Sequence, residues 1–323
     1  MDNSIKLLGE DDFLSAMENE NKKWRKEHVT RGTLTSFDGT RLNYYIATPK
    51  EPRGSITIVH GMGEFWGKYH EYAWYLYQAG YKVFFMELRG HGYSEGKVSD
   101  PQLIYIDDYN TYAEDLLSFV ETVVVPESDG LDMKLICHSM GGAISVLFLE
   151  KHPQYFKSAI LNSPMLKMKA EKNLSPFVIF FLKLYGKIFR KEKSIAPNQK
   201  RFDQNTTLEN SSAKSRPRFE YQLALRKKDE HYQTTGATLG WALASVKVTK
   251  DIFKHINNIK IPIDIFTAGQ DHLINPAGYD MFKEMLPQTR IHAYNESRHE
   301  IFNADEATRK RYYTEVLEVL NGK

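Results

Sequence analysis

The strongest constraint in the sequence is residues 134–143, where an apolar run ends at Ser139 and two glycines follow at once. The apolar run predicts a buried strand, and residues 143–150 have the pattern of a helix. Ser139 then lies at the apex of a sharp strand-to-helix turn. Because strand and helix nearly touch at such a turn, the side chains two positions either side of the serine must be small. Those positions hold Cys137 and Gly141.

This pattern is the G-x-S-x-G nucleophile elbow, with Cys137 in place of the first glycine. The elbow holds its serine in a strained backbone conformation that raises the hydroxyl clear of the sheet. A serine followed by glycines after a strand is also common in simple turns, so the elbow alone leaves both interpretations open.

Composition limits the classes of protein to which the chain can belong. With 323 residues, 41% hydrophobic and 26% charged, we expect two globular domains or one α/β domain with an insertion. The net charge of +2 argues against a nucleic-acid partner. A single cysteine excludes an internal disulfide and fits the reducing cytoplasm. The polar N-terminus lacks the pattern of a signal peptide, and no run of about 18 apolar residues predicts a membrane span.

Strands and helices alternate along two parts of the chain. Asp38-Gly39 between two alternating runs predicts a hairpin. Further strands are expected over 56–59, 81–88, 133–137, 158–161, 263–268 and 291–294, and helices over 68–78, 109–125, 276–286 and 308–320. The predicted organisation is a helical extension over 1–28, an α/β core over 29–164, an inserted cap over 165–247, and the rest of the core over 248–323.

The predicted cap holds no clear strand and carries most of the positive charge. Ser175-Pro176 predicts a helix start, and a very apolar stretch runs from there to Phe189. Residues 165–201 contain ten Lys or Arg against two Glu, a local charge of +8. Such a helix is typical of one that lies on anionic lipid, which predicts peripheral membrane contact through residues 175–193. A cap helix buried against the core is an equal alternative. A second cap helix is expected to begin at Gly236–Trp241.

Two loops could supply backbone amides to an oxyanion. One follows the strand 56–59 and reads His60-Gly61-Met62-Gly63-Glu64. The other is the elbow itself. In an enzyme that forms a tetrahedral intermediate, the donors would be the amides of Met62 and Met140. The alternative for the first loop is a plain strand-exit turn.

A serine nucleophile needs a histidine base and an acid that orients it. Asp271 follows the strand 263–268, and His299 follows the last strand, so Ser139, Asp271 and His299 have the expected order at strand ends. The rival candidates are disfavoured by their predicted positions inside a strand or helix, or beside a triad member: Asp264, Asp280, His292, His272 and His138. The chain has no metal-ligand spacing and no dinucleotide or P-loop motif, so we expect no metal and no cofactor.

Five motifs together resemble those of the monoacylglycerol lipase and bacterial lysophospholipase group of α/β-hydrolases. They occur in the expected order, at residues 60–64, 89–94, 138–142, 269–271 and 297–300. The resemblance implies a mostly parallel eight-stranded sheet flanked by helices, with a helical cap that forms an acyl-chain tunnel. It also implies that Ser139, Asp271 and His299 form the triad and that Met62 and Met140 supply the oxyanion hole.

The resemblance implies a serine hydrolase acting on a single-chain lipid ester through an acyl-enzyme on Ser139. The basic cap favours a lysophospholipid, whose headgroup carries phosphate, over a monoacylglycerol. A general carboxylesterase, an acyltransferase and a non-catalytic binding protein on the same fold are alternatives. The expected location is the cytoplasm, with peripheral contact at the inner face of the membrane.

Overall fold

The computed structural model describes residues 5–96, 98–173 and 175–322. Eight strands form one sheet in the order β1-β2-β4-β3-β6-β7-β9-β10. Their bounds are β1 Val29–Thr35, β2 Arg41–Ala47, β3 Gly54–Val59, β4 Tyr81–Met86, β6 Met133–His138, β7 Ser158–Asn162, β9 Ile263–Ala268 and β10 Arg290–Tyr294. Only β1 with β2 and β2 with β4 pair antiparallel in this sheet. The predicted mostly parallel eight-stranded sheet is therefore confirmed.

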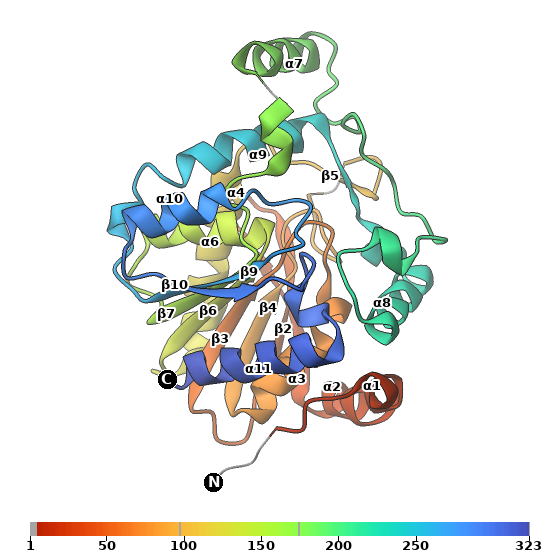
Figure 1. Ribbon diagram of the computed structural model, residues 1–323, viewed down its shortest axis with the longest axis vertical. Coiled ribbons are helices and arrows are strands. Elements are labelled where there is room, and N and C mark those ends of the chain that lie inside the picture. Colours follow the sequence, from red (N-terminus) through yellow and green to blue (C-terminus); the bar gives the residue numbers. More distant parts are fainter. Residues whose placement is uncertain (1–4, 97, 174, 323) are drawn as a thin grey trace.

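Helices cover both faces of the sheet (Figure 1). On one face, α4 Tyr109–Phe119, α6 Met140–Lys151 and α10 Ala277–Met285 share a hydrophobic core with one side of the strands. On the other face, α3 His70–Gln78 and α11 Glu306–Leu320 form a second core, rich in tyrosine. Alternate residues of one strand enter different cores, as with Phe84 and Phe85 of β4, because successive side chains of a strand point to opposite faces. Short α5 Val125–Ser128 continues α4 through a π-turn at Val120–Val124.

The segment between β7 and β9 contains the residues of the predicted cap. Its helices are α7 Pro176–Ile188, α8 Arg216–Lys228 and α9 Leu239–Asp251, with short 3-10 turns between them. The Ser175 side chain accepts a hydrogen bond from the Val178 amide, which confirms the predicted helix start. Figure 1 shows α7 at the far end of this segment, away from the sheet.

Two details of the cap differ from the prediction. Gly236–Ala237 forms a two-residue strand, β8, that pairs in parallel with β5 Leu103–Ile104. The expectation of no strand in this segment was therefore wrong, because so short a pairing leaves no pattern in the sequence. The helix expected from Gly236 begins only at Leu239, where the Thr238 hydroxyl caps it by accepting a hydrogen bond from Trp241 N at 3.3 Å.

The N-terminal helices α1 Glu10–Ala16 and α2 Lys22–His28 are joined by a π-turn at Met17–Asn21. Phe13, Met17 and Trp24 are buried and form an apolar stripe along this extension.

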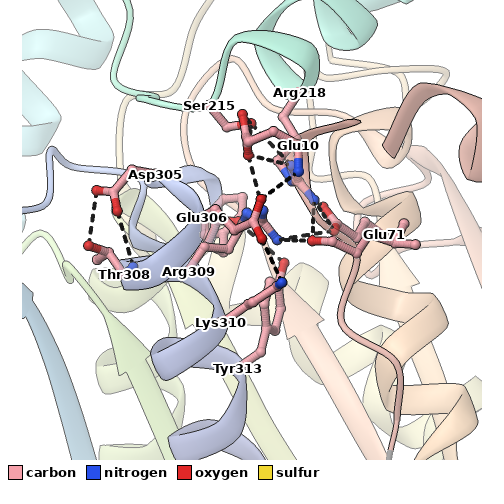
Figure 2. Close-up of polar contacts among 12 residues, drawn as sticks. Glu10, Glu71, Ser215, Arg218, Asp305, Glu306, Thr308, Arg309, Lys310 and Tyr313 are labelled. Carbon is pink, nitrogen blue, oxygen red and sulfur yellow. Dashed lines mark hydrogen bonds and ion pairs between the residues drawn. The ribbon is translucent and has the colours of Figure 1, made fainter. Parts of the chain in front are cut away.

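A buried ionic network ties this extension to the cap and to α11 (Figure 2). Arg218 of α8 donates to both carboxylate oxygens of Glu71, at 2.8 and 2.6 Å, and to Glu10 at 2.9 Å. Arg309 of α11 also bonds Glu10, at 3.0 Å. Both arginines are at most 1% exposed. Because an unpaired buried charge is very costly, these contacts fix the start of α8 on the core.

Candidate active site

Ser139 lies between β6 and α6 in a conformation that few residues other than glycine adopt. Its φ is 52° and its ψ is −118°, which costs on the order of 1–3 kcal/mol. Its carbonyl oxygen accepts hydrogen bonds from Gly142 N and Met165 N, each at 2.8 Å, and its amide donates to Asn162 O at 3.0 Å. These bonds hold the strained turn in place, and the serine is the candidate nucleophile.

The two small residues beside Ser139 are not equally constrained. A Cβ at Gly141 would lie 2.2 Å from Val59 O and 2.7 Å from His60 O, so α6 touches the end of β3 there. Cys137 instead turns its side chain into the hydrophobic core, where it is fully buried. The fold thus accommodates the Cβ that replaces the usual glycine. Burial raises the pKa of the Cys137 thiol to about 12, so the reactive thiolate is absent near neutral pH.

His299 and Asp271, predicted from strand ends, are in direct contact. His299 Nδ1 lies 2.6 Å from Asp271 Oδ2. Asp271 Oδ1 accepts hydrogen bonds from the amides of Leu273 at 2.8 Å and Ile274 at 3.0 Å. The two loops are joined by a hydrogen bond from Gln270 N to Ser297 O at 2.9 Å. The carboxylate is therefore fixed from three directions.

The protonation states suit a base and its orienting acid. Burial raises the pKa of Asp271, but the hydrogen bonds from His299 and the two amides outweigh it and leave that pKa below its usual value. Burial lowers the pKa of His299, against the opposing effect of Asp271. An ionised carboxylate only accepts hydrogen bonds, so Nδ1 carries the proton and Nε2 has a free lone pair. Among the described residues, Nε2 has no hydrogen-bond partner.

The rival acids and bases lie elsewhere. Asp264 pairs with Arg290 and His292, each at 2.7 Å, and His292 stacks on Phe266 at a centroid separation of 4.4 Å. Asp280 and His272 are exposed to solvent. Asp264 and His292 therefore pair with each other on β9 and β10, at one edge of the sheet, whereas the elbow follows β6.

Met62 and Met140, the two predicted oxyanion donors, lie near the point where α6 touches the end of β3. Met140 is the first residue of α6, and the amides at a helix N-terminus carry partial positive charge. Met62 lies in the loop after β3, the strand whose end meets Gly141. Within that loop, His60 Nδ1 contacts Gly61 O at 2.7 Å and His60 Nε2 accepts from Leu88 N at 2.9 Å. This leaves the loop braced by a fully buried ring.

A buried cluster beneath these loops was missed by the sequence analysis. The Glu64 carboxylate accepts from Gly61 N at 2.5 Å, Tyr69 OH at 2.6 Å and Lys68 Nζ at 2.8 Å, and lies 2.9 Å from His138 Nδ1. Burial raises the pKa of Glu64, but His138 and Lys68 outweigh it and hold that pKa well below its usual value.

The same cluster reaches the loop that carries the candidate base. Lys68 pairs with Glu300 at 2.6 Å, and the rings of His138 and His299 lie 4.7 Å apart. Glu64 therefore connects the β3 loop, the elbow and the His299 loop. Glu64 and His138 are visible in the sequence motifs, but no spacing rule predicts this contact.

The arrangement holds a candidate nucleophile, a candidate base in contact with an acid, and two candidate amide donors. Among the residues that the structure describes, no three His, Cys, Asp or Glu side chains gather as metal ligands. Within the same residues, no helix is long and apolar enough to span a membrane. The contact of His299 with Asp271 and the strained turn at Ser139 are features suited to acyl transfer to a side-chain hydroxyl.

Several known proteins are similar in sequence to this chain. The model of a hydrolase family described as serine aminopeptidase, S33, matches residues 50–306. A monoacylglycerol lipase of Mycolicibacterium smegmatis is 26% identical over 285 residues, which cover 87% of this chain and 92% of that protein. Lysophospholipase L2 of Escherichia coli K12 is 25% identical over 232 residues, which cover 71% of this chain and 67% of that protein.

Solved structures show the same fold. A carboxyl esterase from Bacillus coagulans aligns with a TM-score of 0.73 and 20% identity, covering 91% of this chain and 98% of the esterase. A variant of the monoglyceride lipase of Saccharomyces cerevisiae aligns with a TM-score of 0.70 and 18% identity, covering 91% and 94%. The α/β-hydrolase fold predicted from the motifs is confirmed.

Proposed function

This chain belongs to the hydrolase family described as serine aminopeptidase, S33, and on that premise we propose that it cleaves the carboxylic ester of a single-chain lipid. The observation that carries the proposal is the contact of His299 with Asp271 in a fold whose elbow holds Ser139 at positive φ. We assign these three residues as the catalytic triad.

The proposed reaction follows from the protonation states. Neutral His299 takes the proton of the Ser139 hydroxyl through Nε2 while the serine oxygen attacks the ester carbonyl. The amides of Met62 and Met140 hold the oxyanion of the tetrahedral intermediate. Protonated His299, oriented by Asp271, then gives its proton to the leaving alcohol. Water repeats the cycle on the acyl-enzyme and releases a fatty acid.

We propose a lysophospholipid as the substrate, with a monoacylglycerol as the alternative. Relatives of both kinds match the chain over more than two thirds of its length. The local charge of +8 over residues 165–201 favours the lysophospholipid, because the headgroup of this lipid carries a phosphate and the membranes that contain it are often anionic.

We further propose that the protein works in the cytoplasm, in peripheral contact with anionic membrane through residues 175–193. The large apolar side chains of α7 are exposed, with Phe177 71% and Ile188 61% accessible, and only Gly186 of this helix is buried. Lys183 and Lys187 lie exposed on the same helix. Exposed aromatic and aliphatic side chains beside lysines suit the boundary between lipid headgroups and acyl chains.

The first experiment is labelling by a fluorophosphonate probe. We expect the wild type to be labelled and Ser139→Ala to lose labelling, with ester hydrolysis falling on the order of 10⁶-fold. Ser145→Ala, at a buried serine of α6, is the matched control and should retain labelling. Folded wild type that resists the probe, or labelling that survives in Ser139→Ala, would contradict the assignment.

A panel of esters with one acyl chain then tests the substrate. Faster hydrolysis of lauroyl lysophosphatidylcholine than of monolauroylglycerol supports the lysophospholipid. Hydrolysis of the glycerol ester alone would establish the alternative.

A further inference from the structure

A cavity of about 570 Å³ lies between the cap and the core, and we call it the α8 cavity. It is lined on the cap side by α8 and by residues 200–213, and on the core side by Lys68 and Glu300. Its lining carries four cationic residues against two carboxylates, namely Lys68, Lys200, Arg201, Arg226, Asp203 and Glu300. Counted by its lining residues alone, the cavity carries a formal charge of +2.

Two of the cations already have carboxylate partners. Lys68 lies between Glu64 at 2.8 Å and Glu300 at 2.6 Å. Arg201 pairs with Asp100 at 2.6 Å. The cations of the lining without a carboxylate partner are therefore Lys200, which is exposed, and Arg226, and the lining also holds the exposed carboxylate of Asp203.

Arg226 is the unusual member of the lining. It lies in the last turn of α8, with its guanidinium over the ring of Phe65 at 5.1 Å. One nitrogen donates to Thr235 Oγ1 at 3.1 Å and the other donates to Gly63 O. Among the described residues, no carboxylate lies within ion-pair distance of it. Burial lowers the pKa of Arg226 to about 10, against the electrostatic attraction of the Glu300 and Glu64 carboxylates.

A guanidinium has five N–H donors in a planar fork that matches phosphate oxygens. The bonds to Thr235 and Gly63 leave three of these donors, on a charge that no carboxylate of the described residues contacts as an ion pair. A neutral glycerol headgroup could accept these hydrogen bonds but would leave the charge uncompensated. A phosphate satisfies both requirements, because charge-assisted bonds from arginine to phosphate are roughly twice as strong as neutral ones.

Two residues in contact with the α8 cavity or its arginine belong to the loops that carry proposed catalytic residues. Gly63, which Arg226 bonds, follows the proposed oxyanion donor Met62 in the chain. Glu300, in the cavity wall, follows His299, the group that would protonate the leaving alcohol. In a lysophospholipid that alcohol is the glycerol that bears the phosphate.

We propose that the α8 cavity binds the phosphate of the substrate's glycerophosphodiester headgroup, with Arg226 as its main ligand and Lys200 as a second. This inference rests on the proposed lipid-ester hydrolysis and adds the residues that select the headgroup. Because the phosphate is bound in both the ground state and the transition state, its loss should act mainly through KM.

The kinetic test compares kcat/KM for lauroyl lysophosphatidylcholine and monolauroylglycerol, both below their micelle concentrations. Arg226→Gln should lower the ratio of the two values by about 10- to 100-fold, the effect of a lost charge-assisted phosphate contact. Lys200→Gln should lower it by about threefold, because its ammonium is solvated. The matched control is Lys227→Gln, which removes the same charge from an exposed neighbour on α8 outside the cavity lining.

The ratio distinguishes recognition from damage to the loop at Gly63. If Arg226→Gln lowered both kcat/KM values equally, Arg226 would be a structural support and the proposal would be overturned. An unchanged ratio, or an equal fall in Lys227→Gln, would overturn it as well.

A binding experiment tests the phosphate site without relying on the proposed ester hydrolysis. Calorimetric titration of Ser139→Ala with glycerophosphocholine should give heat that disappears in Ser139→Ala/Arg226→Gln, and glycerol should give none. Binding of inorganic phosphate without glycerophosphocholine would assign a free-anion site and overturn the headgroup site. If the wild type hydrolysed neither ester while glycerophosphocholine bound through Arg226, the proposed function would fail and the phosphate site would stand. If neither glycerophosphocholine nor inorganic phosphate binds, the ratio of the two kcat/KM values decides. An unchanged ratio in Arg226→Gln overturns the phosphate site, and a lowered ratio supports it.

Discussion

Gly141 is the position where the elbow can be tested by a single methyl group. A Cβ there would lie 2.2 Å from Val59 O and 2.7 Å from His60 O, both backbone atoms, whereas Cβ atoms rarely approach heavy atoms within 3.4 Å. Gly141→Ala must therefore move α6 away from β3 by about 1 Å, because a packed backbone cannot yield as a flexible side chain does. Overpacking of this kind costs about 1–3 kcal/mol of stability.

The same displacement moves Ser139 relative to the proposed base and oxyanion donors. A misplacement of about 1 Å costs on the order of 10²-fold in rate. We therefore expect Gly141→Ala to react with a fluorophosphonate about 10²-fold more slowly than the wild type while remaining folded by circular dichroism. Labelling at the wild-type rate would refute the argument that contact with β3 sets the elbow.

Cys137→Gly is the matched change on the other side of Ser139. It restores the usual glycine but empties a fully buried core position, so we expect a loss of about 1–2 kcal/mol in urea unfolding. Its labelling rate should stay near that of the wild type, because the cysteine side chain is accommodated. A variant that reacted about tenfold faster would show that the cysteine strains the elbow.

Three further predictions follow from the site and the cap. Glu64→Gln should lower the free energy of urea unfolding by about 3–5 kcal/mol, because Lys68 and the other donors to Glu64 lose a buried charged acceptor. A loss below about 1 kcal/mol would exclude a stabilising role for Glu64. Burial holds the pKa of His299 below its usual 6.5, and the proposed base acts when neutral. The labelling rate should therefore fall on acidification with a midpoint below pH 6.5. A midpoint above pH 7 would contradict this assignment of the base. Replacing exposed Phe180 and Ile188 of α7 by serine should reduce co-sedimentation with anionic vesicles about tenfold, and unchanged binding would place the membrane contact elsewhere.

The core of the fold could be predicted because its signals are local. The inner strands are mainly apolar runs, and the carboxyl ends of parallel strands share one edge of the sheet. That rule was enough to select Asp271 and His299 as neighbours from residues 28 positions apart. The effect of Cys137, which replaces the first glycine of the elbow pattern, could not be judged from the sequence. That effect depends on which side of the turn touches β3, and this is the Gly141 side.

The contacts that could not be predicted join distant residues without any repeating pattern. Lys68 and Glu300 are 232 positions apart, and neither residue type is expected to be buried. The β5–β8 pairing joins Leu103 to Gly236 through two-residue strands. Such contacts depend on how segments far apart in the chain pack together, about which periodicity carries no information.

The cap's positive charge divides into two kinds of residue with different physical consequences. Helix α8 is held at its start by Arg218, bonded to Glu71, and in its last turn by Arg226, bonded to Gly63 beside the proposed oxyanion donor. Arg226 therefore has a fixed position and direction, which is what selection of one headgroup requires. The lysines of α7 are solvated on long side chains, and solvated charges attract an anionic surface without selecting among its lipids. Substrate choice should thus depend on α8 and membrane attraction on α7, so substitutions in one helix should leave the property of the other intact.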